Sequence, residues 1–231
     1  MKNMYETEVI DIVKETSDTY SVKMNVPEGF TWEAGQFTMW AFKDHQVAEG
    51  DNPTRVFTIA SAPEDNYLMF TTRIDEKHTS WKDIVLNDLK VGDKILVRNA
   101  NGKFRIHNEY KNSFIIAGGI GITPIRSLMR HLVDNNDLDH KFIVLYSDDR
   151  GEFAYKEDFA KITDALPNLE LVYISDRDEF NAKVEEYAKE TQNNAEYLIA
   201  GSPGMNKAFA TKLESLGVSE DNIKTDNFQG Y

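Results

Sequence analysis

The sequence predicts two domains, a small antiparallel β-barrel followed by a doubly wound α/β domain built on a parallel sheet. The chain has 231 residues, enough for two domains of ordinary size. Residues 1 to about 106 read as short strands separated by turns, whereas strand-like and helix-like segments alternate from Ser113 onward. The polar stretch 107–112 marks the boundary, so we predict domains at residues 1–108 and 109–231.

The first half contains short strands, several of which alternate apolar and polar residues, as in residues 21–26. Turns such as Pro27-Glu28-Gly29 separate them at even spacing, which is typical of a small antiparallel barrel. One helix is expected near residues 79–89. The predicted strands are residues 7–13, 20–26, 36–42, 55–60, 67–73 and 94–98.

The second half alternates strands and helices, the pattern of a parallel sheet covered by helices on its faces. Ligands of such sheets bind at the carboxyl ends of the strands, so we expect the site there. The predicted strands are residues 114–117, 142–146, 169–174 and 197–200, and the predicted helices are residues 125–133, 156–165, 179–189 and 205–216.

Residues 114–124 are the most informative segment. A buried strand runs into three glycines, Gly118, Gly119 and Gly121, where a backbone without side chains can turn sharply against a bound group. Thr123 can cap a helix that has proline at its first position. A strand, a glycine turn and a helix N-terminus together offer N–H groups to a phosphate. An ordinary strand-to-helix turn is the alternative, because the segment matches neither G-x-G-x-x-G nor a Walker loop.

Composition excludes several classes of protein. No stretch approaches the roughly 18–20 apolar residues of a membrane span, and the N-terminus lacks the apolar core of a signal peptide, so we expect a cytoplasmic protein. The chain has no cysteine, which excludes disulfides, a thiolate nucleophile and a cysteine-ligated iron–sulfur cluster, and no histidine pattern indicates a metal site. The net charge of −13 argues against nucleic-acid binding, although a glycine turn and an arginine can still hold a small anion.

An ordered set of short motifs runs through nearly the whole chain. In order, they are Gly35-Gln36-Phe37, Arg55-Val56-Phe57-Thr58, Thr79-Ser80-Trp81, Val91-Gly92-Asp93, Gly102-Lys103-Phe104, residues 118–124, Gly201-Ser202-Pro203-Gly204-Met205 and residues 226–231. This set resembles the ferredoxin–NADP reductase superfamily of flavoenzymes. The resemblance implies that the barrel is six-stranded and binds FAD, with FMN less favoured, and that the second domain binds NADH or NADPH.

The Arg55-Val56-Phe57-Thr58 motif matches the family's R-x-Y-S/T. The resemblance implies that Arg55 pairs with the flavin pyrophosphate and that Phe57, in place of the usual tyrosine, lies against the isoalloxazine. Thr58 is expected to reach flavin N5, the atom that receives hydride, and is our first catalytic candidate. Val56 is included with the cofactor-binding residues.

The start of the barrel's helix matches the positions that contact the second flavin phosphate. Thr79 and Ser80 are expected to supply hydroxyls and helix-start N–H groups there. Arg73 is also expected to bind cofactor. Trp81 either packs on the adenine or belongs to the core, and we favour the core because large aromatic side chains are mostly structural.

In the second domain, the resemblance assigns the dinucleotide pyrophosphate to the glycine turn and the nicotinamide to the segment that begins at Gly201. The implied binding residues are Gly118, Gly119, Gly121, Thr123, Gly201 and Met205. Ala200 stands where the family usually has a cysteine that positions the nicotinamide over the flavin. This departure puts the efficiency of hydride transfer in doubt, but not its possibility, because the step depends mainly on positioning.

The last residues resemble the family's terminal E-x-F, with Asp226 in place of glutamate. Phe228 is then expected to border the flavin or the nicotinamide pocket, which makes it the second catalytic candidate. Tyr231 is an alternative stacking residue, and packing of either ring on the nearest surface is the ordinary alternative.

Two loops bear on the choice between NADH and NADPH, because a 2′-phosphate requires cations and hydroxyls. Residues 147–150 and 175–178 each carry a serine and an arginine, but also aspartates that would repel a phosphate. Ser175 and Arg177 loosely resemble the family's S-R pair and favour NADPH.

These observations predict an FAD-dependent NAD(P)H oxidoreductase that moves hydride from NAD(P)H to flavin N5. Its electrons would pass to a separate, unidentified acceptor, such as a ferredoxin- or flavodoxin-like carrier. A stand-alone NAD(P)H:flavin reductase is the first alternative. A flavin- or nucleotide-binding electron-transfer or regulatory subunit with little turnover is the second.

Overall fold

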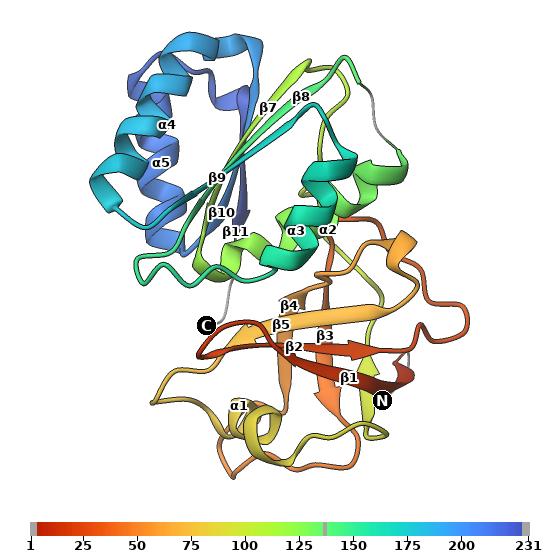
Figure 1. Cartoon of the computed structure of the whole chain (residues 1–231). Helices are drawn as coiled ribbons and strands as arrows, with labels where there is room; N and C mark the ends of the chain where they lie inside the picture. Colours follow the sequence, from red (N-terminus) through yellow and green to blue (C-terminus); the bar gives the residue numbers. More distant parts are fainter. Residues whose placement is uncertain (1–3, 136–137, 228–231) are drawn as a thin grey trace.

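The computed structural model describes residues 4–135 and 138–227, and it shows a strand-rich half packed against an α/β half (Figure 1). The strand-rich half is one six-stranded antiparallel sheet in the order β4-β3-β6-β1-β2-β5. Its strands are β1 (Tyr5–Lys14), β2 (Thr19–Met24), β3 (Phe37–Phe42), β4 (Thr54–Thr58), β5 (Leu68–Arg73) and β6 (Lys94–Val97).

The sheet curls so that its two outer strands, β4 and β5, meet. Just beyond β4, the Ala60 N–H donates to the Met69 carbonyl oxygen across 2.7 Å. Aromatic rings fill the interior: Phe57 stacks on Phe70 with ring centroids 5.5 Å apart and meets Trp81 at 5.3 Å. Trp81 is fully buried, which confirms the prediction that it belongs to the core.

The helix expected near residues 79–89 is present but irregular. Thr79 caps α1 (Ser80–Asp83) by accepting a hydrogen bond from the Lys82 N–H. The helix then widens into a π-helical turn at Ile84–Asp88.

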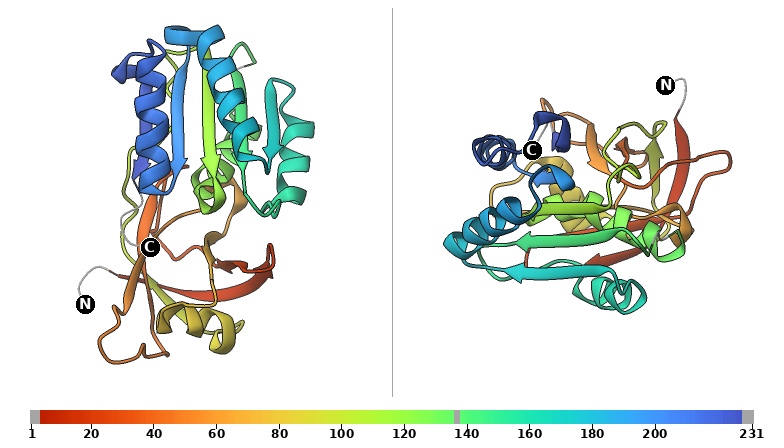
Figure 2. Two further views of the ribbon diagram at one scale, coloured as in Figure 1. Left: turned by 90° about the vertical axis from the view of Figure 1, so that its left-hand side faces the viewer. Right: turned by 90° about the horizontal axis from the view of Figure 1, so that it is seen from above.

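The α/β half has a five-stranded parallel sheet in the order β11-β10-β7-β8-β9. Its strands are β7 (Asn112–Gly118), β8 (Lys141–Ser147), β9 (Leu169–Ile174), β10 (Glu196–Gly201) and β11 (Ile223–Asn227). Helices α2 (Ile122–Asp134) and α3 (Lys156–Ala165) cover one face, and α4 (Arg177–Thr191) and α5 (Pro203–Ser215) cover the other. The two pairs lie on opposite sides of the sheet in Figure 1, and the left view of Figure 2 looks onto the side of α4 and α5. The predicted fold class is therefore confirmed.

Every predicted strand is present with its ends shifted by a residue or two, whereas β11 was not predicted. The prediction that Thr123 caps the helix after the glycine turn is wrong. A 3-10 turn at Gly119–Gly121 leads directly into α2, whose N-cap is Gly121. Thr123 already lies inside the first turn, and its hydroxyl donates to the Ile120 carbonyl oxygen at 3.1 Å.

A buried arginine on α2 joins the two halves. The Arg126 side chain is 3% exposed and forms ion pairs with Asp65 of the barrel half and, at 2.7 Å, with Asp158 on α3. It also donates to the Ala60 carbonyl oxygen and to the Tyr67 hydroxyl. Burial opposes its charge, but Asp65, Tyr67 and Asp158 together outweigh burial and raise the pKa of Arg126.

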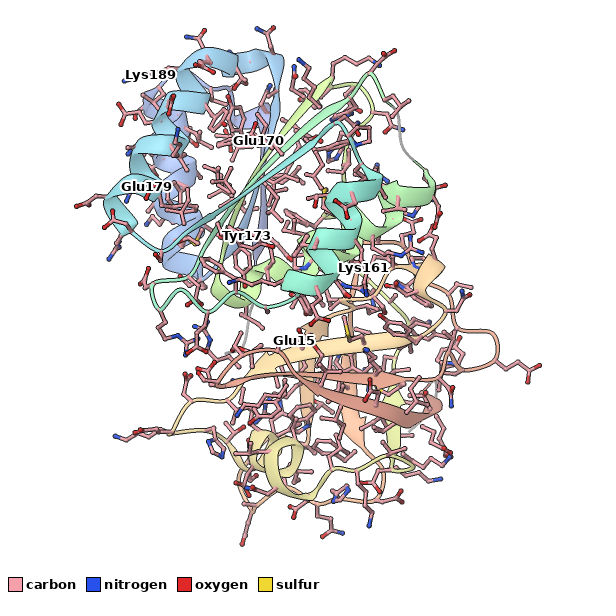
Figure 3. All side chains as sticks on the ribbon, in the orientation of Figure 1. Glu15, Lys161, Glu170, Tyr173, Glu179 and Lys189 are labelled. Carbon is pink, nitrogen blue, oxygen red and sulfur yellow. The ribbon has the colours of Figure 1, made fainter. Side chains whose placement is uncertain are left out.

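The loop after β8 forms a second connection between the halves. Arg150 pairs with Asp18 at 2.5 Å, and the Tyr155 hydroxyl donates to Thr71 Oγ1 at 2.5 Å. Tyr155 N–H donates to Glu15, which Figure 3 shows at the junction of the halves. The two halves are thus tied together at several points of their junction.

No helix in the described parts of the chain is long and apolar enough to span a membrane.

Candidate functional site

A cleft of about 1000 Å³ opens between the barrel half and the carboxyl edge of the parallel sheet. The barrel half contributes β4, the end of β5 and the start of α1. The other half contributes the ends of β7 and β8 and the first parts of α4 and α5. The predicted site residues that line this cleft are Arg55, Phe57, Arg73, Thr79, Gly118, Gly119, Arg177 and Met205. Residues widely separated in sequence are therefore brought together in one site.

Other predicted residues do not form the cleft wall. Alternation along β4 directs Val56 and Thr58 away from Arg55 and Phe57; Val56 is 43% exposed and Thr58 is buried. The contact of Thr58 with flavin N5 stays a prediction. Ser80 is partly buried, Gly121, Thr123 and Gly201 are buried, and Ser175 is exposed outside the cleft. Phe228 and Tyr231 lie outside the described residues.

Arg55 and Ser80 converge on one carboxylate, that of Asp51. Arg55 Nη2 lies 2.6 Å from Asp51 Oδ1, and Ser80 Oγ donates to Oδ2 at 2.7 Å. The Trp81 N–H donates to the same oxygen at 3.2 Å. Burial opposes ionisation of Asp51, but the hydrogen bonds from Ser80 and Arg55 outweigh it and hold its pKa far below the usual range. These donors form an anion site, in which the carboxylate stands where a phosphate could lie.

Arg73 lies directly beside the glycine turn. A Cβ built on Gly119 would be 3.5 Å from Arg73 Nη2, so the guanidinium faces the backbone that is predicted to hold a pyrophosphate. The same nitrogen is held by an acidic residue of the α/β half, because Nη2 also lies 2.6 Å from Asp148 Oδ2. Asp148 is nearly fully buried, and Arg150 approaches its second oxygen at 3.5 Å.

The wall of the cleft is positively charged although the protein is acidic. Burial lowers the pKa of Lys82; Asp75 opposes this change, and the nearby charges of Arg55 and Arg73 add to it. His78 also lines the cleft, and its hydrogen bonds to the Asp75 carbonyl oxygen and to Asp83 raise its pKa. Grouped cations of this kind suit phosphorylated ligands, and a flavin nucleotide and a nicotinamide dinucleotide both fit that requirement.

The glycines of the turn are required by close approach. A Cβ on Gly118 would lie 2.3 Å from Met205 Sδ, and a Cβ on Gly121 would lie 2.1 Å from the Ala200 carbonyl oxygen. Met205 therefore covers the end of β7, where it forms part of the cleft wall. Ala200 is fully buried near the end of β10.

The far end of the cleft lies between α4 and α5. Arg177, Asn181 and Lys212 line it together with Phe180 and Phe209. Arg177 is in the first turn of α4, where Asp176 caps the helix by accepting from the Glu179 N–H at 2.8 Å. Two basic side chains thus face the region opposite the barrel's arginines.

Sequence reasoning missed the acidic partners of Arg55 and Arg73. Asp51 lies in a turn-rich segment before β4, and no periodicity or motif distinguishes it. Asp148 belongs to a loop whose sequence bears only on the choice of cofactor. His78 and Lys82 were also missed, although their position just before and within the predicted helix was a usable signal.

The comparisons agree with this architecture. A protein-family profile described as "Oxidoreductase NAD-binding domain" matches residues 115–211. A Na(+)-translocating NADH-quinone reductase subunit from Psychrobacter cryohalolentis is 29% identical over 213 residues, which cover 80% of this chain and 51% of that protein. The corresponding protein from Yersinia enterocolitica is 28% identical over 248 residues, covering 96% of this chain and 59% of that protein. The chain therefore spans little more than half the length of these curated relatives.

Solved structures share the whole fold. Ferredoxin-NADP+ reductase from Plasmodium falciparum, solved with 2'P-AMP, superposes with a TM-score of 0.80 at 17% identity, over 98% of this chain and 97% of that one. The Amycolatopsis cytochrome P450 reductase GcoB gives a TM-score of 0.83 at 16% identity, over 99% of this chain and 70% of that one. The chain therefore shares the two-domain fold of these reductases, and residues 115–211 of its second half match the profile of an oxidoreductase NAD-binding domain.

Proposed function

We propose that the chain is a flavin-dependent NAD(P)H oxidoreductase. Residues 1–108 would hold the flavin, with FAD favoured, and residues 109–231 would hold NAD(P)H. One observation carries the proposal: a single cleft has an anion site at Arg55 and Ser80 on the barrel side, and a second cation, Arg73, beside the glycine turn on the other. Two phosphorylated ligands bound at these points would meet in one cleft.

The chain's own residues would bind and orient the two ligands. Arg55 and Ser80, which Asp51 already engages, would lie beside a flavin phosphate, and the Phe57 ring lies in the cleft wall where an isoalloxazine can pack. Arg73 and the N–H groups of the glycine turn would hold the dinucleotide pyrophosphate. The bound flavin would supply the redox chemistry, accepting hydride at N5 and releasing electrons singly or in pairs. Thr58 and Phe228 remain our candidates for the neighbours of N5.

We propose NADPH as the preferred donor. Arg177 and Lys212 face the end of the cleft opposite the barrel's arginines, and the carboxylate of Asp148, which could otherwise repel a 2′-phosphate, is held by Arg73. The curated relatives are named as NADH-quinone reductase subunits, so the test compares NADPH with NADH as the hydride donor. The electron acceptor would be a separate protein or free flavin, since the relatives are named as subunits of a reductase.

The experiment is spectroscopic. Purified protein, supplied with FAD if it is colourless, should show flavin absorption, and anaerobic NADPH should bleach it faster than NADH. Bleaching by NADH alone would overturn the donor preference. A protein that binds neither FAD nor FMN would contradict the proposed function. Tight binding of both ligands without turnover of any dye acceptor would favour a regulatory or electron-transfer subunit instead.

A further inference from the structure

Asp51 uses both carboxylate oxygens to occupy the donors that the flavin phosphate needs. Oδ1 takes Arg55 Nη2 at 2.6 Å, and Oδ2 takes the Ser80 hydroxyl at 2.7 Å and the Trp81 N–H at 3.2 Å. The remaining terminal nitrogen of Arg55 is also engaged, because Nη1 donates to the carbonyl oxygens of Asn52 and Thr54. Little of the guanidinium is left for a ligand.

The geometry of the β3–β4 connection builds this arrangement. Gly50 has φ of +85°, a left-handed conformation that glycine adopts without strain, and the next residue, Asp51, bonds to Arg55 and Ser80. The Ala48 N–H also donates to Ser80 Oγ at 2.9 Å, which fixes the loop against the start of α1. The Arg55 and Asp51 side chains are 12% and 18% exposed, so their ion pair is shielded from solvent screening.

The negative charge of Asp51 weakens the attraction of Arg55 for a phosphate. A phosphate that approaches Arg55 meets a cation that is already neutralised, and it meets the Asp51 carboxylate at the same donors. Its binding must displace that carboxylate or accept its repulsion. Much of the affinity that a charged phosphate contact normally supplies is therefore lost at this position.

We propose that Asp51 is a specificity-determining residue of the flavin site: its carboxylate holds the place of a flavin phosphate, so phosphorylated flavins bind little more tightly than riboflavin and exchange during turnover. The inference rests on the proposed function. It implies that flavin is a substrate that binds and leaves in each turnover, and not a permanently bound cofactor. Recognition of flavin then depends mainly on the isoalloxazine ring, which riboflavin, FMN and FAD share.

The test measures dissociation constants of riboflavin, FMN and FAD by fluorescence quenching in the full chain and in Asp51→Asn. The wild type should bind FAD less than about tenfold more tightly than riboflavin, whereas Asp51→Asn should bind FMN and FAD about tenfold or more tightly than the wild type does, the range of a charge-assisted hydrogen bond. Riboflavin affinity should change less than about twofold, which also shows that the ring pocket is intact. Asp51→Ala should change the affinities in the same direction, without a new amide donor.

Two controls separate this effect from general electrostatics. Glu49→Gln removes one negative charge from an exposed position in the same connection and should leave all three affinities unchanged. Arg55→Ala in the Asp51→Asn background should abolish the gain, because the gain requires the released guanidinium.

The possible outcomes separate a failure of the role of Asp51 from a failure of the proposed function. If Asp51→Asn weakens FMN and FAD binding, Asp51 orients Arg55 for the phosphate and the inference is overturned, while the proposed function stands. An unchanged ratio of FAD to riboflavin affinity also overturns it. If no flavin binds to the wild type or to either variant, the proposed function falls and the inference falls with it.

Discussion

Replacement of Gly121 by alanine tests how closely the glycine turn approaches the end of β10. The new Cβ would lie 2.1 Å from the Ala200 carbonyl oxygen and 2.4 Å from its carbon, far inside van der Waals contact. Both neighbours are backbone atoms of a central strand, so relief requires α2 and β10 to separate. Overpacking usually costs about 1–3 kcal/mol, and because no flexible side chain can yield here, we expect about 3 kcal/mol.

The assay is thermal unfolding followed by circular dichroism or calorimetry. For a domain of this size, about 3 kcal/mol corresponds to a fall in Tm of roughly 6–12 °C. Two matched glycine-to-alanine changes calibrate the result. At Gly118 the new Cβ meets the flexible end of Met205, which can move, so the loss should be smaller. At Gly204, in the first turn of α5, nothing lies within 4 Å and alanine should be neutral or slightly stabilising. Equal Tm values for the Gly121 and Gly204 variants would refute the reasoning.

Three further predictions concern the cleft and the junction. Arg73→Ala should raise the KM for NAD(P)H at least about tenfold while changing riboflavin affinity less than about twofold, because the guanidinium lies beside Gly119; equal loss of both ligands in titrations would contradict the assignment. Arg126→Met should cost about 1–3 kcal/mol in denaturant unfolding, because the buried carboxylate of Asp65 loses Arg126 and keeps Arg130, 3.2 Å away, as its cationic partner; a loss below about 1 kcal/mol would show the Arg126–Asp65 ion pair to be unimportant. Burial raises the pKa of Asp226 from 3.8 to about 7, so the folded carboxyl stays protonated while the unfolded one ionises, and stability should fall as pH rises between these values. Asp226→Asn should therefore raise Tm more at about pH 8 than at about pH 5, and the same Tm difference at both pH values would exclude this effect.

The fold was predictable because each half has a periodicity of its own. Alternation in the first half and strand–helix repetition in the second identified the barrel, the parallel sheet and the order of the elements. The missed strand β11 (Ile223–Asn227) reads Ile-Lys-Thr-Asp-Asn, which has one large apolar residue and no alternation. Its strand state comes from pairing with β10, a tertiary contact that local sequence does not encode.

The start of α2 was predicted at the wrong residue. The residues Thr123-Pro124 resemble a helix start, but the glycines allow a 3-10 turn that begins the helix before them. Capping preference is worth only about 1 kcal/mol, so the geometry of the turn prevails over it.

The candidate site was predictable where motifs mark it and not where partners come from elsewhere in the chain. Arg55, Phe57, Arg73 and the glycine turn were found because they lie in recognisable segments. The partnership of Arg73 with Asp148 joins residues 75 positions apart, and no local pattern encodes it.

The connections across the junction have a consequence for how the protein would work. Arg126, Arg150 and Tyr155 each bond across the junction and together hold the halves against one another. The spacing between a donor ring in one half and an acceptor ring in the other would then be set once, during folding, instead of being recreated by a closing movement in each catalytic cycle. Solvent viscosity should therefore slow the arrival and departure of small molecules but leave the transfer step itself untouched.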